Sequence, residues 1–303
     1  MSKERLAGIL LASFKTIPLS LRRRLFIGLS KLFYNFVPRQ RMIALYNLRR
    51  AFPDKSDEEI TKIALGVYRN MAIVAAEFFD LPGLTKEKLG KIVEVEGLEN
   101  SEKALAKGRG VLLFGAHFGN WELEAVAVSL LVKPVVVIYR LLDSPLLESL
   151  VSRVRSATGN IPVPKENSMR SMLRTLKKNG IIGILIDQNT AWYEGVFVDY
   201  FDRPACTTNG LALLALHSGA PVLPAYSIRL PDGRYRFVFE PEMEIINTGN
   251  RDEDVIANTQ LFTKVIEKTV RRYPEQWLWV HQRWKTQPCQ VPQNVKRTIK
   301  EDI

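Results

Sequence analysis

The fold of this 303-residue chain is decided by one stretch, Val111-Leu112-Leu113-Phe114-Gly115-Ala116-His117-Phe118-Gly119-Asn120-Trp121-Glu122. Its first four residues are apolar without polar alternation, which is typical of a central strand covered on both faces. From Leu123 the apolar residues recur at helical spacing, so the turn joins a strand to a helix. His117 is therefore expected at the carboxyl end of a central strand, where α/β sheets place their ligands.

Four further β-rich runs alternate with helix-like segments downstream. They are residues 135–139, 181–186, 222–228 and 235–239. This alternation predicts an α/β fold with a mixed, mainly parallel central sheet flanked by helices. Upstream, apolar residues at helical spacing predict a long helix over residues 54–80, with Asp54 and Ser56 as candidate caps.

The sequence contains no linker, repeat or low-complexity tract. We therefore expect one α/β domain over residues 51–288. It would follow a basic amphipathic helical segment over residues 1–50 and precede a C-terminal tail over residues 289–303.

Positive charge is concentrated at the N-terminus. Residues 1–50 hold eleven Lys and Arg against the single acid Glu4, whereas the whole chain has a net charge of +11, so the remainder is close to neutral. Apolar residues form one stripe if this segment is helical, and basic residues flank or interrupt it. The stripe is Leu25, Leu29, Leu32, Phe33 and Phe36, and the basic residues are Arg22, Arg23, Arg24 and Lys31.

This pattern predicts attachment to an anionic membrane surface. The alternative is an amphipathic helix pair packed on the protein's own core. No apolar run reaches the roughly 18 residues of a spanning helix, so we expect the segment to lie on the membrane. The bulk of the chain is then expected on the cytoplasmic side.

His117 and Glu122 are the candidate catalytic pair. A carboxylate at Glu122 can fold back onto one imidazole nitrogen and leave the other free to accept a proton. The motif holds no Ser or Cys nucleophile, so the pair would activate an incoming hydroxyl directly, without an acyl-enzyme. The alternative is a buried histidine satisfied by a carboxylate. Asn120, between the two, is a candidate substrate-binding residue.

Further candidate substrate-binding residues follow other predicted strands. Arg140 comes after residues 135–139, and it either binds an anionic headgroup or donor phosphopantetheine or is a solvated loop arginine. Asp187 and Gln188 follow residues 181–186, where a carboxylate either lines the site or caps the next turn.

The remaining histidines, His217 and His281, are expected to be packed or partly buried. No spacing of His and Cys matches a metal site, so we expect neither a metal nor a cofactor. The two cysteines, Cys206 and Cys289, fit a reducing compartment.

The stretch from Gly115 to Glu122 resembles the first block of the late lipid A (lauroyl/myristoyl) acyltransferases, within the lysophospholipid/glycerolipid acyltransferase superfamily. Similar blocks follow in the family's order, from about Asn47 to Lys285. They are Asn47-Leu48-Arg49-Arg50-Ala51-Phe52-Pro53 before the histidine, then Tyr139-Arg140 with Pro145, Arg155 before Thr158-Gly159, Asp187-Gln188, Phe197 with Phe201 and Thr207-Thr208, Gly219-Ala220-Pro221-Val222-Leu223-Pro224, and Trp277-Leu278-Trp279-Val280-His281-Gln282-Arg283-Trp284-Lys285.

The resemblance implies a glycerolipid acyltransferase-like fold, with His117 as base and Glu122 as its partner. It implies acyl transfer from acyl carrier protein or coenzyme A to a hydroxyl of a lipid A precursor, at the cytoplasmic face of a bacterial inner membrane. Arg155 matches a family arginine near the dyad, which would hold a phosphate or an oxyanion. Its alternative is an ordinary helix-surface arginine.

Other functions stay open at this point. The acceptor could be another glycolipid or a lysophospholipid, because Tyr200-Phe201-Asp202-Arg203 and Asp143-Ser144-Pro145 depart from the family's usual Phe-Phe-Gly and Asn-x-Pro. A non-catalytic peripheral membrane protein would keep the fold without the chemistry. A nucleic-acid-binding protein is disfavoured, because the basic residues accompany an amphipathic apolar segment and no binding motif is present.

Overall fold

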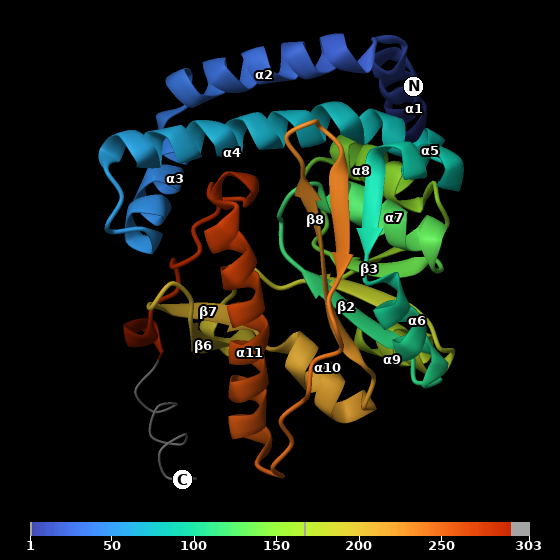
Figure 1. The fold of residues 1–303 in the computed structure, drawn as a ribbon, viewed down its shortest axis with the longest axis vertical. Coiled ribbons are helices and arrows are strands. Elements are labelled where there is room, and N and C mark those ends of the chain that lie inside the picture. The colour runs from blue at the N-terminus through green and yellow to red at the C-terminus, as the bar shows by residue number, and fades with distance from the viewer. Residues whose placement is uncertain (1, 167, 292–303) are drawn as a thin grey trace.

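The computed structural model describes residues 2–166 and 168–291. Its centre is a seven-stranded sheet (Figure 1). In spatial order the strands are β1 (Val93–Glu96), β9 (Tyr235–Phe239), β8 (Val222–Arg229), β2 (Val111–Gly115), β5 (Ile181–Leu185), β3 (Val135–Tyr139) and β4 (Ile161–Pro164). Strands β8 to β4 are parallel, whereas β9 runs antiparallel to β8 and pairs in parallel with β1. The predicted mixed, mainly parallel α/β sheet is confirmed.

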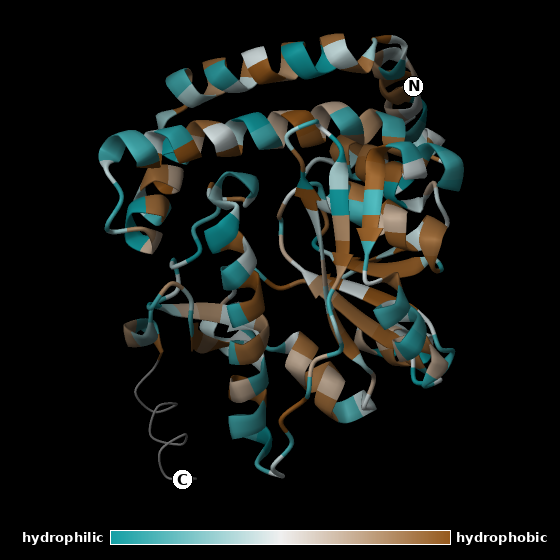
Figure 2. Cartoon of the chain, in the orientation of Figure 1, coloured by the Kyte–Doolittle hydropathy of each residue, from teal (hydrophilic) through white to brown (hydrophobic). Residues whose placement is uncertain are grey.

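Helices cover both faces of this sheet, as the apolar run in β2 predicts. Leu112 and Phe114 belong to the buried cluster that includes residues of α11, while Val111 and Leu113 belong to the cluster that includes α7. Figure 2 shows the central strands as strongly apolar. The flanking helices are α5 (Lys86–Ile92), α6 (Leu98–Ala106), α7 (Trp121–Leu131), α8 (Pro145–Ser156), α9 (Met169–Lys177), α10 (Gly210–Ser218) and α11 (Arg251–Arg272).

The long helix predicted over residues 54–80 is α4 (Asp57–Glu77), which continues into the 3-10 helix η1 (Phe78–Gly83). It begins at Ser56, whose hydroxyl accepts from the Glu59 N–H while the Glu59 carboxylate accepts from the Ser56 N–H. This reciprocal cap satisfies two backbone donors that a helix start otherwise leaves free.

Three helices precede α4, namely α1 (Lys3–Thr16), α2 (Leu19–Phe36) and α3 (Pro38–Ala51). Helix α2 lies along the outer side of α4 (Figure 1). The outward side of α2 exposes a row of apolar residues, Leu21, Leu25, Leu29, Leu32 and Phe36. The helices pack on the protein, as the second alternative expects, and α2 still presents an apolar stripe to the outside; attachment to a membrane stays a prediction. No helix in the described part of the chain is long and apolar enough to span a bilayer.

The arginines at positions 22–24, which were expected to flank or interrupt the apolar stripe and to favour a membrane surface, have three different settings. Arg22 is fully buried, donates to the Phe14 carbonyl at 2.7 Å and pairs with Asp80. Arg23 pairs with Glu77 at 2.6 Å. Only Arg24 is exposed. The physical reason is that α1, α4 and η1 supply acceptors for the first two, so these cations hold α2 on the protein.

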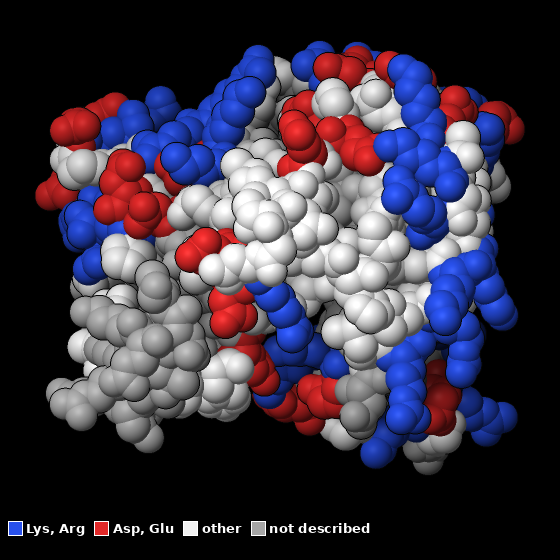
Figure 3. Space-filling view, turned by 90° about the horizontal axis from the view of Figure 1, so that it is seen from below, with Lys and Arg blue, Asp and Glu red and all other residues white. Residues whose placement is uncertain are grey.

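The remaining elements are a β6–β7 hairpin (Gly195–Asp199 and Pro204–Thr208) and short 3-10 turns, of which η3 (Pro274–Gln276) begins the segment described below. The view from below shows Lys and Arg gathered along one side, where Figure 1 places α6 and α9 (Figure 3). The basic residues of these two helices include Lys103 of α6 and Arg174 and Lys177 of α9. The chain beyond residue 50 is thus nearly neutral in sum but not evenly charged. The predicted tail over residues 289–303 lies, from residue 292 onward, outside the residues that the structure describes.

Candidate active site

The turn between β2 and α7 carries His117, as the sequence predicts. Asn120 caps α7, because its side-chain oxygen accepts from the Leu123 N–H at 3.0 Å. Gly119 has φ +57°, and a Cβ there would lie 1.7 Å from the Ser227 carbonyl oxygen. Only glycine therefore allows the turn to pack this closely on β8. The His117 side chain is 22% exposed.

The imidazole of His117 is held by Asp187. Strands β2 and β5 are paired with Gly115 opposite Leu185, so the residues two positions further on are neighbours at the same sheet edge. His117 Nδ1 lies 2.9 Å from Asp187 Oδ1, and the His117 backbone N–H donates to Oδ2 at 3.0 Å. Trp277 Nε1–H also donates to Oδ2, at 2.8 Å.

These contacts determine which atoms of the two side chains carry protons. Burial alone raises the pKa of Asp187, but the opposing effects of His117 and the Trp277 N–H outweigh burial and hold it below the ordinary value. An ionised carboxylate only accepts, so Nδ1 of a neutral His117 carries the proton and donates it to Asp187. The Nε2 atom is then left free to accept a proton.

The expectation that Glu122 bonds the imidazole is wrong in this structure. The Glu122 carboxylate instead accepts from Arg155 twice, Nε to Oε2 at 3.0 Å and Nη2 to Oε1 at 2.5 Å. Trp121 Nε1–H donates to Oε1 at 3.2 Å. The physical reason is that an arginine on the neighbouring helix α8 offers a bidentate partner, while the strand register supplies His117 with a closer carboxylate.

Arg155 is a partly buried member of this group, so the alternative of an ordinary surface arginine does not hold. Its side chain is 19% exposed, and its guanidinium lies 5.4 Å from the centre of the Tyr139 ring. Burial opposes its charge, but the Glu122 carboxylate outweighs burial and raises the pKa of Arg155. The Arg155 guanidinium therefore stays charged beside the turn that carries His117.

The other candidate residues fall into different settings. Asn120 is 1% exposed and its amide donates to Glu77 and Tyr235, so the structure gives it a capping role and corrects its assignment to substrate binding. Arg140 extends from an exposed loop and pairs with Asp143 at 2.9 Å. Gln188 follows Asp187 at the strand end and is half-buried.

Residues 274–286, which include the block Trp277 to Lys285 matched from the sequence, cross the turn that carries His117. The Leu278 N–H donates to the His117 carbonyl at 3.1 Å, and the Gly119 N–H donates to the Gln276 carbonyl at 2.9 Å. Asn47 of α3 holds the far side, because its amide donates to the carbonyls of Trp279 and His281 at 2.8 and 2.7 Å.

The two other histidines have no base-like setting. His281 is partly buried, as expected, and its Nε2 accepts from the Asn189 N–H at 3.0 Å. Burial lowers the pKa of His281. His217 is exposed at the end of α10, which corrects the expectation that it packs inside.

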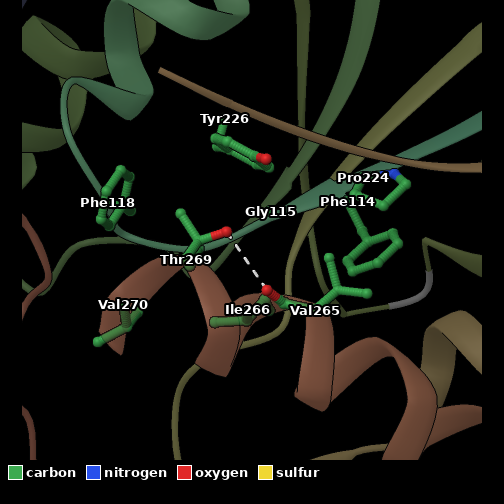
Figure 4. A pocket seen from close by; sticks show the side chains of 10 residues that line it. Phe114, Gly115, Phe118, Pro224, Tyr226, Val265, Ile266, Thr269 and Val270 are labelled. Atoms are coloured by element: carbon green, nitrogen blue, oxygen red, sulfur yellow. Dashed lines mark hydrogen bonds between the residues drawn. The ribbon is translucent and has the colours of Figure 1, made fainter. Parts of the chain in front are cut away.

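An apolar cavity lies between β2, β8 and α11 (Figure 4). Its lining includes Phe114, Phe118, Tyr226 and Ile266, and the Thr269 hydroxyl donates to the Val265 carbonyl beside it. The cavity volume is about 10 Å³, roughly one water molecule. It is a packing gap and does not hold an acyl chain in this conformation.

The structure places a histidine at the end of a central parallel strand and pairs it with a buried carboxylate. The comparisons identify the family. Residues 5–286 match the model of the bacterial lipid A biosynthesis acyltransferases. The chain belongs to this family and is an O-acyltransferase.

Individual relatives agree with this assignment. The chain is 31% identical to the lipid A biosynthesis palmitoleoyltransferase of Escherichia coli K12 over 255 residues, covering 84% of this chain and 81% of that protein. It is 30% identical to the lauroyltransferase of the same strain over 280 residues, covering 91% and 89%.

Two more distant similarities were found. A phosphatidylinositol mannoside acyltransferase of Mycobacterium tuberculosis (strain CDC 1551 / Oshkosh) is 26% identical over 221 residues, covering 69% of this chain and 66% of that protein. The 1-acyl-sn-glycerophosphate acyltransferase PlsC of Thermotoga maritima superposes with a TM-score of 0.37 at 15% identity, covering 83% and 94% of the two chains.

Proposed function

We propose that this protein transfers a fatty acyl group from an acyl carrier protein or coenzyme A thioester to a hydroxyl of a lipid A precursor. The observation that supports this most is the contact of His117 Nδ1 with Asp187, because it leaves Nε2 free on a side chain that is 22% exposed. The relatives named above as lipid A palmitoleoyl- and lauroyltransferases support the acceptor class.

The residues support a direct transfer. Nε2 takes the proton of the acceptor hydroxyl as its oxygen attacks the thioester carbonyl, and Asp187 stabilises the imidazolium that forms. The tetrahedral intermediate collapses with loss of the thiolate, which takes the proton from Nε2. The products are one ester and one free thiol, and no acyl-enzyme is formed.

Arg155 and Arg140 are proposed to act on charges of the substrates. Arg155 keeps donors beyond the two that bind Glu122, and a fixed guanidinium near the turn can stabilise the developing oxyanion or a phosphate. Glu122 then serves catalysis by holding Arg155. Arg140 on its exposed loop, with Gln188 at the neighbouring strand end, is proposed to meet the anionic donor or the headgroup.

The apolar stripe of α2 is proposed to attach the protein to the cytoplasmic face of a bacterial inner membrane. Five large apolar side chains of this helix are exposed in a row, and Phe36 is 78% exposed. Arg24 and Lys31 lie exposed on the same helix, which favours an anionic lipid surface. Met42 and Tyr46 of α3 are exposed as well.

A second acceptor class deserves a test because of one relative. The similarity to a phosphatidylinositol mannoside acyltransferase favours another glycolipid as the alternative acceptor. The reaction and the roles of His117 and Asp187 would be unchanged, because only the hydroxyl carrier differs.

The test is transfer of a labelled acyl group from either thioester to tetra-acylated lipid A precursor, in parallel with a mannosylated phosphoinositide. We expect product on the lipid A precursor with wild type and loss of product with His117→Ala. Product on the mannolipid alone would move the acceptor to the second class. Absence of turnover of both donors would contradict the proposed reaction and favour a non-catalytic membrane protein.

A further inference from the structure

Glu77 is a buried carboxylate that the proposed chemistry does not use. It is the last residue of α4 and is 7% exposed. Its Oε1 accepts from Arg23 at 2.6 Å and from Arg229 at 3.0 Å. Its Oε2 accepts from the Asn120 amide at 2.7 Å and from the Tyr235 hydroxyl. One carboxylate thus joins α2, α4, β8, β9 and the catalytic turn.

One end of this network is the turn that carries His117. Asn120 lies three residues after the histidine and caps α7 with its side-chain oxygen, while its amide nitrogen binds Glu77. Asn70, two helical turns before Glu77 on α4, donates to the Gly119 carbonyl at 3.0 Å. Arg229 connects Asn70 with Glu77, because its Nε donates to Asn70 Oδ1 at 3.2 Å and its Nη1 donates to Glu77. Helix α4 therefore holds the turn at two points.

The other end is α2, the helix with the exposed apolar stripe. Arg23 donates to Glu77 through both Nε and Nη2, at 3.1 and 2.6 Å, and its side chain is 34% exposed. It therefore lies at the boundary between α2 and α4. Any displacement of α2 from α4 removes this cation from Glu77.

The charge of Glu77 is maintained by these partners. Burial alone raises the pKa of Glu77, but Arg229, Tyr235 and Arg23 outweigh burial and hold it below the ordinary value. The carboxylate is therefore ionised at neutral pH. Losing Arg23 leaves Arg229 as the cation that still binds the Glu77 carboxylate, and Arg229 then draws the carboxylate toward itself and away from the amide that positions the turn.

We propose that Glu77 is a positioning residue that couples the seating of α2 on α4 to the geometry of the His117 turn. This inference rests on the proposed function for its kinetic consequence, since α2 is the helix that we assign to the membrane. Acyl transfer then proceeds at full rate only while α2 is seated. The arginine that connects the two is Arg23.

The test compares purified Glu77→Gln, Arg23→Gln and the double variant, using acceptor in anionic vesicles. Glu77→Gln keeps the size of the side chain and removes the charge. We expect each single variant to lose roughly 10- to 100-fold in kcat, the range for small misplacement of a catalytic group. The KM for the thioester donor and the vesicle-bound fraction should stay at the wild-type level.

The double variant tests the connection itself. We expect it to be no slower than Glu77→Gln alone, because Arg23 acts through Glu77. Arg23→Lys keeps the charge and should recover most of kcat. The matched control is the exposed pair of Arg49 on α3 and Asp57 on α4, at 2.9 Å, whose variants Arg49→Gln and Asp57→Asn should leave kcat within about twofold.

A readout independent of turnover keeps the coupling testable if no acceptor is turned over. With ¹⁵N-labelled histidine, the His117 ring resonances should shift in Arg23→Gln and Glu77→Gln and stay in place in Arg49→Gln. Unchanged resonances and kcat in folded variants, with only the thermal midpoint lowered, would overturn the coupling and leave Glu77 a structural residue. Losses of the two single variants that multiply in the double variant would overturn it as well. Absence of transfer by wild type would instead contradict the proposed function.

Discussion

Two carboxylates flank the catalytic turn, and they have different partners. Asp187 follows a strand, is 1% exposed in its side chain and holds the imidazole of His117. Glu122 lies in the first turn of a helix and is paired with Arg155. The carboxylate that serves the histidine is therefore its neighbour in the sheet, seventy positions away, while the one five positions away serves an arginine. The predictions below separate these two regions.

The largest expected effect is that of His117→Ala. Loss of a general base costs roughly 10²- to 10⁴-fold in turnover, and we expect a loss in this range. The measurement is kcat with labelled thioester donor, together with the vesicle-bound fraction, which should not change. A variant that keeps most of its turnover would rule out His117 as the base.

Asp187→Asn is expected to cause the second-largest loss of turnover. An amide in this place no longer fixes the imidazole with its proton on Nδ1, so Nε2 is no longer reserved for the substrate proton. We expect kcat to fall by roughly 10²-fold, in line with loss of a group that orients a histidine. Wild-type turnover in the folded variant would contradict the role of Asp187.

Glu122→Gln is expected to have a smaller effect, about tenfold. It loosens Arg155 and leaves the imidazole untouched. The comparison is kcat of Glu122→Gln, Arg155→Gln and the double variant. If Glu122 acts through Arg155, the double variant should resemble Arg155→Gln, whereas multiplied losses would give Glu122 a separate role.

Changing the stripe of α2 should affect membrane binding and not chemistry. In Leu25→Ser/Leu29→Ser/Leu32→Ser we expect a lower vesicle-bound fraction, because the exposed apolar area is reduced. Turnover of a dispersed acceptor should stay within about twofold, since these side chains point away from α4. Unchanged sedimentation with vesicles would transfer attachment to another surface.

The smallest effect concerns Glu124, which lies in the first turn of α7. Burial raises its pKa well above the ordinary 4.5, and its Oε2 is buried without a hydrogen-bond partner among the described residues. Folding therefore favours the protonated form, and stability falls as pH rises above 4.5. Glu124→Gln should raise the thermal midpoint by about 2–4 °C near pH 7 and leave it unchanged near pH 4. An equal shift at both pH values would exclude titration of Glu124 as the cause.

The sequence predicted the architecture better than the details of the site. All five β-rich runs are strands, because continuous apolar residues mark them. Strands β1 and β4 were missed, since Val93–Glu96 alternates with acids and Ile161–Pro164 contains two prolines. These edge strands bury less and so carry a weaker signal.

The position of His117 could be predicted because one continuous stretch contains the strand, the turn and the helix. The partner could not, because it depends on β5 pairing with β2 in a register that no local pattern reveals. Asp187 was predicted as a strand-end residue that lines the site or caps the next turn, and not as the partner of His117. The inward direction of Arg22 and Arg23 was also hidden, because their acceptors lie in α1, α4 and η1.

The most direct test of the central claim is the tautomer of His117, observed by ¹⁵N spectroscopy of the histidine-labelled protein near pH 8. The protein has three histidines, and His117→Ala assigns the resonance. The account predicts a proton on Nδ1 in wild type and in Glu122→Gln, and loss of this state in Asp187→Asn. A proton on Nε2 in wild type, or a state lost in Glu122→Gln but kept in Asp187→Asn, would contradict it.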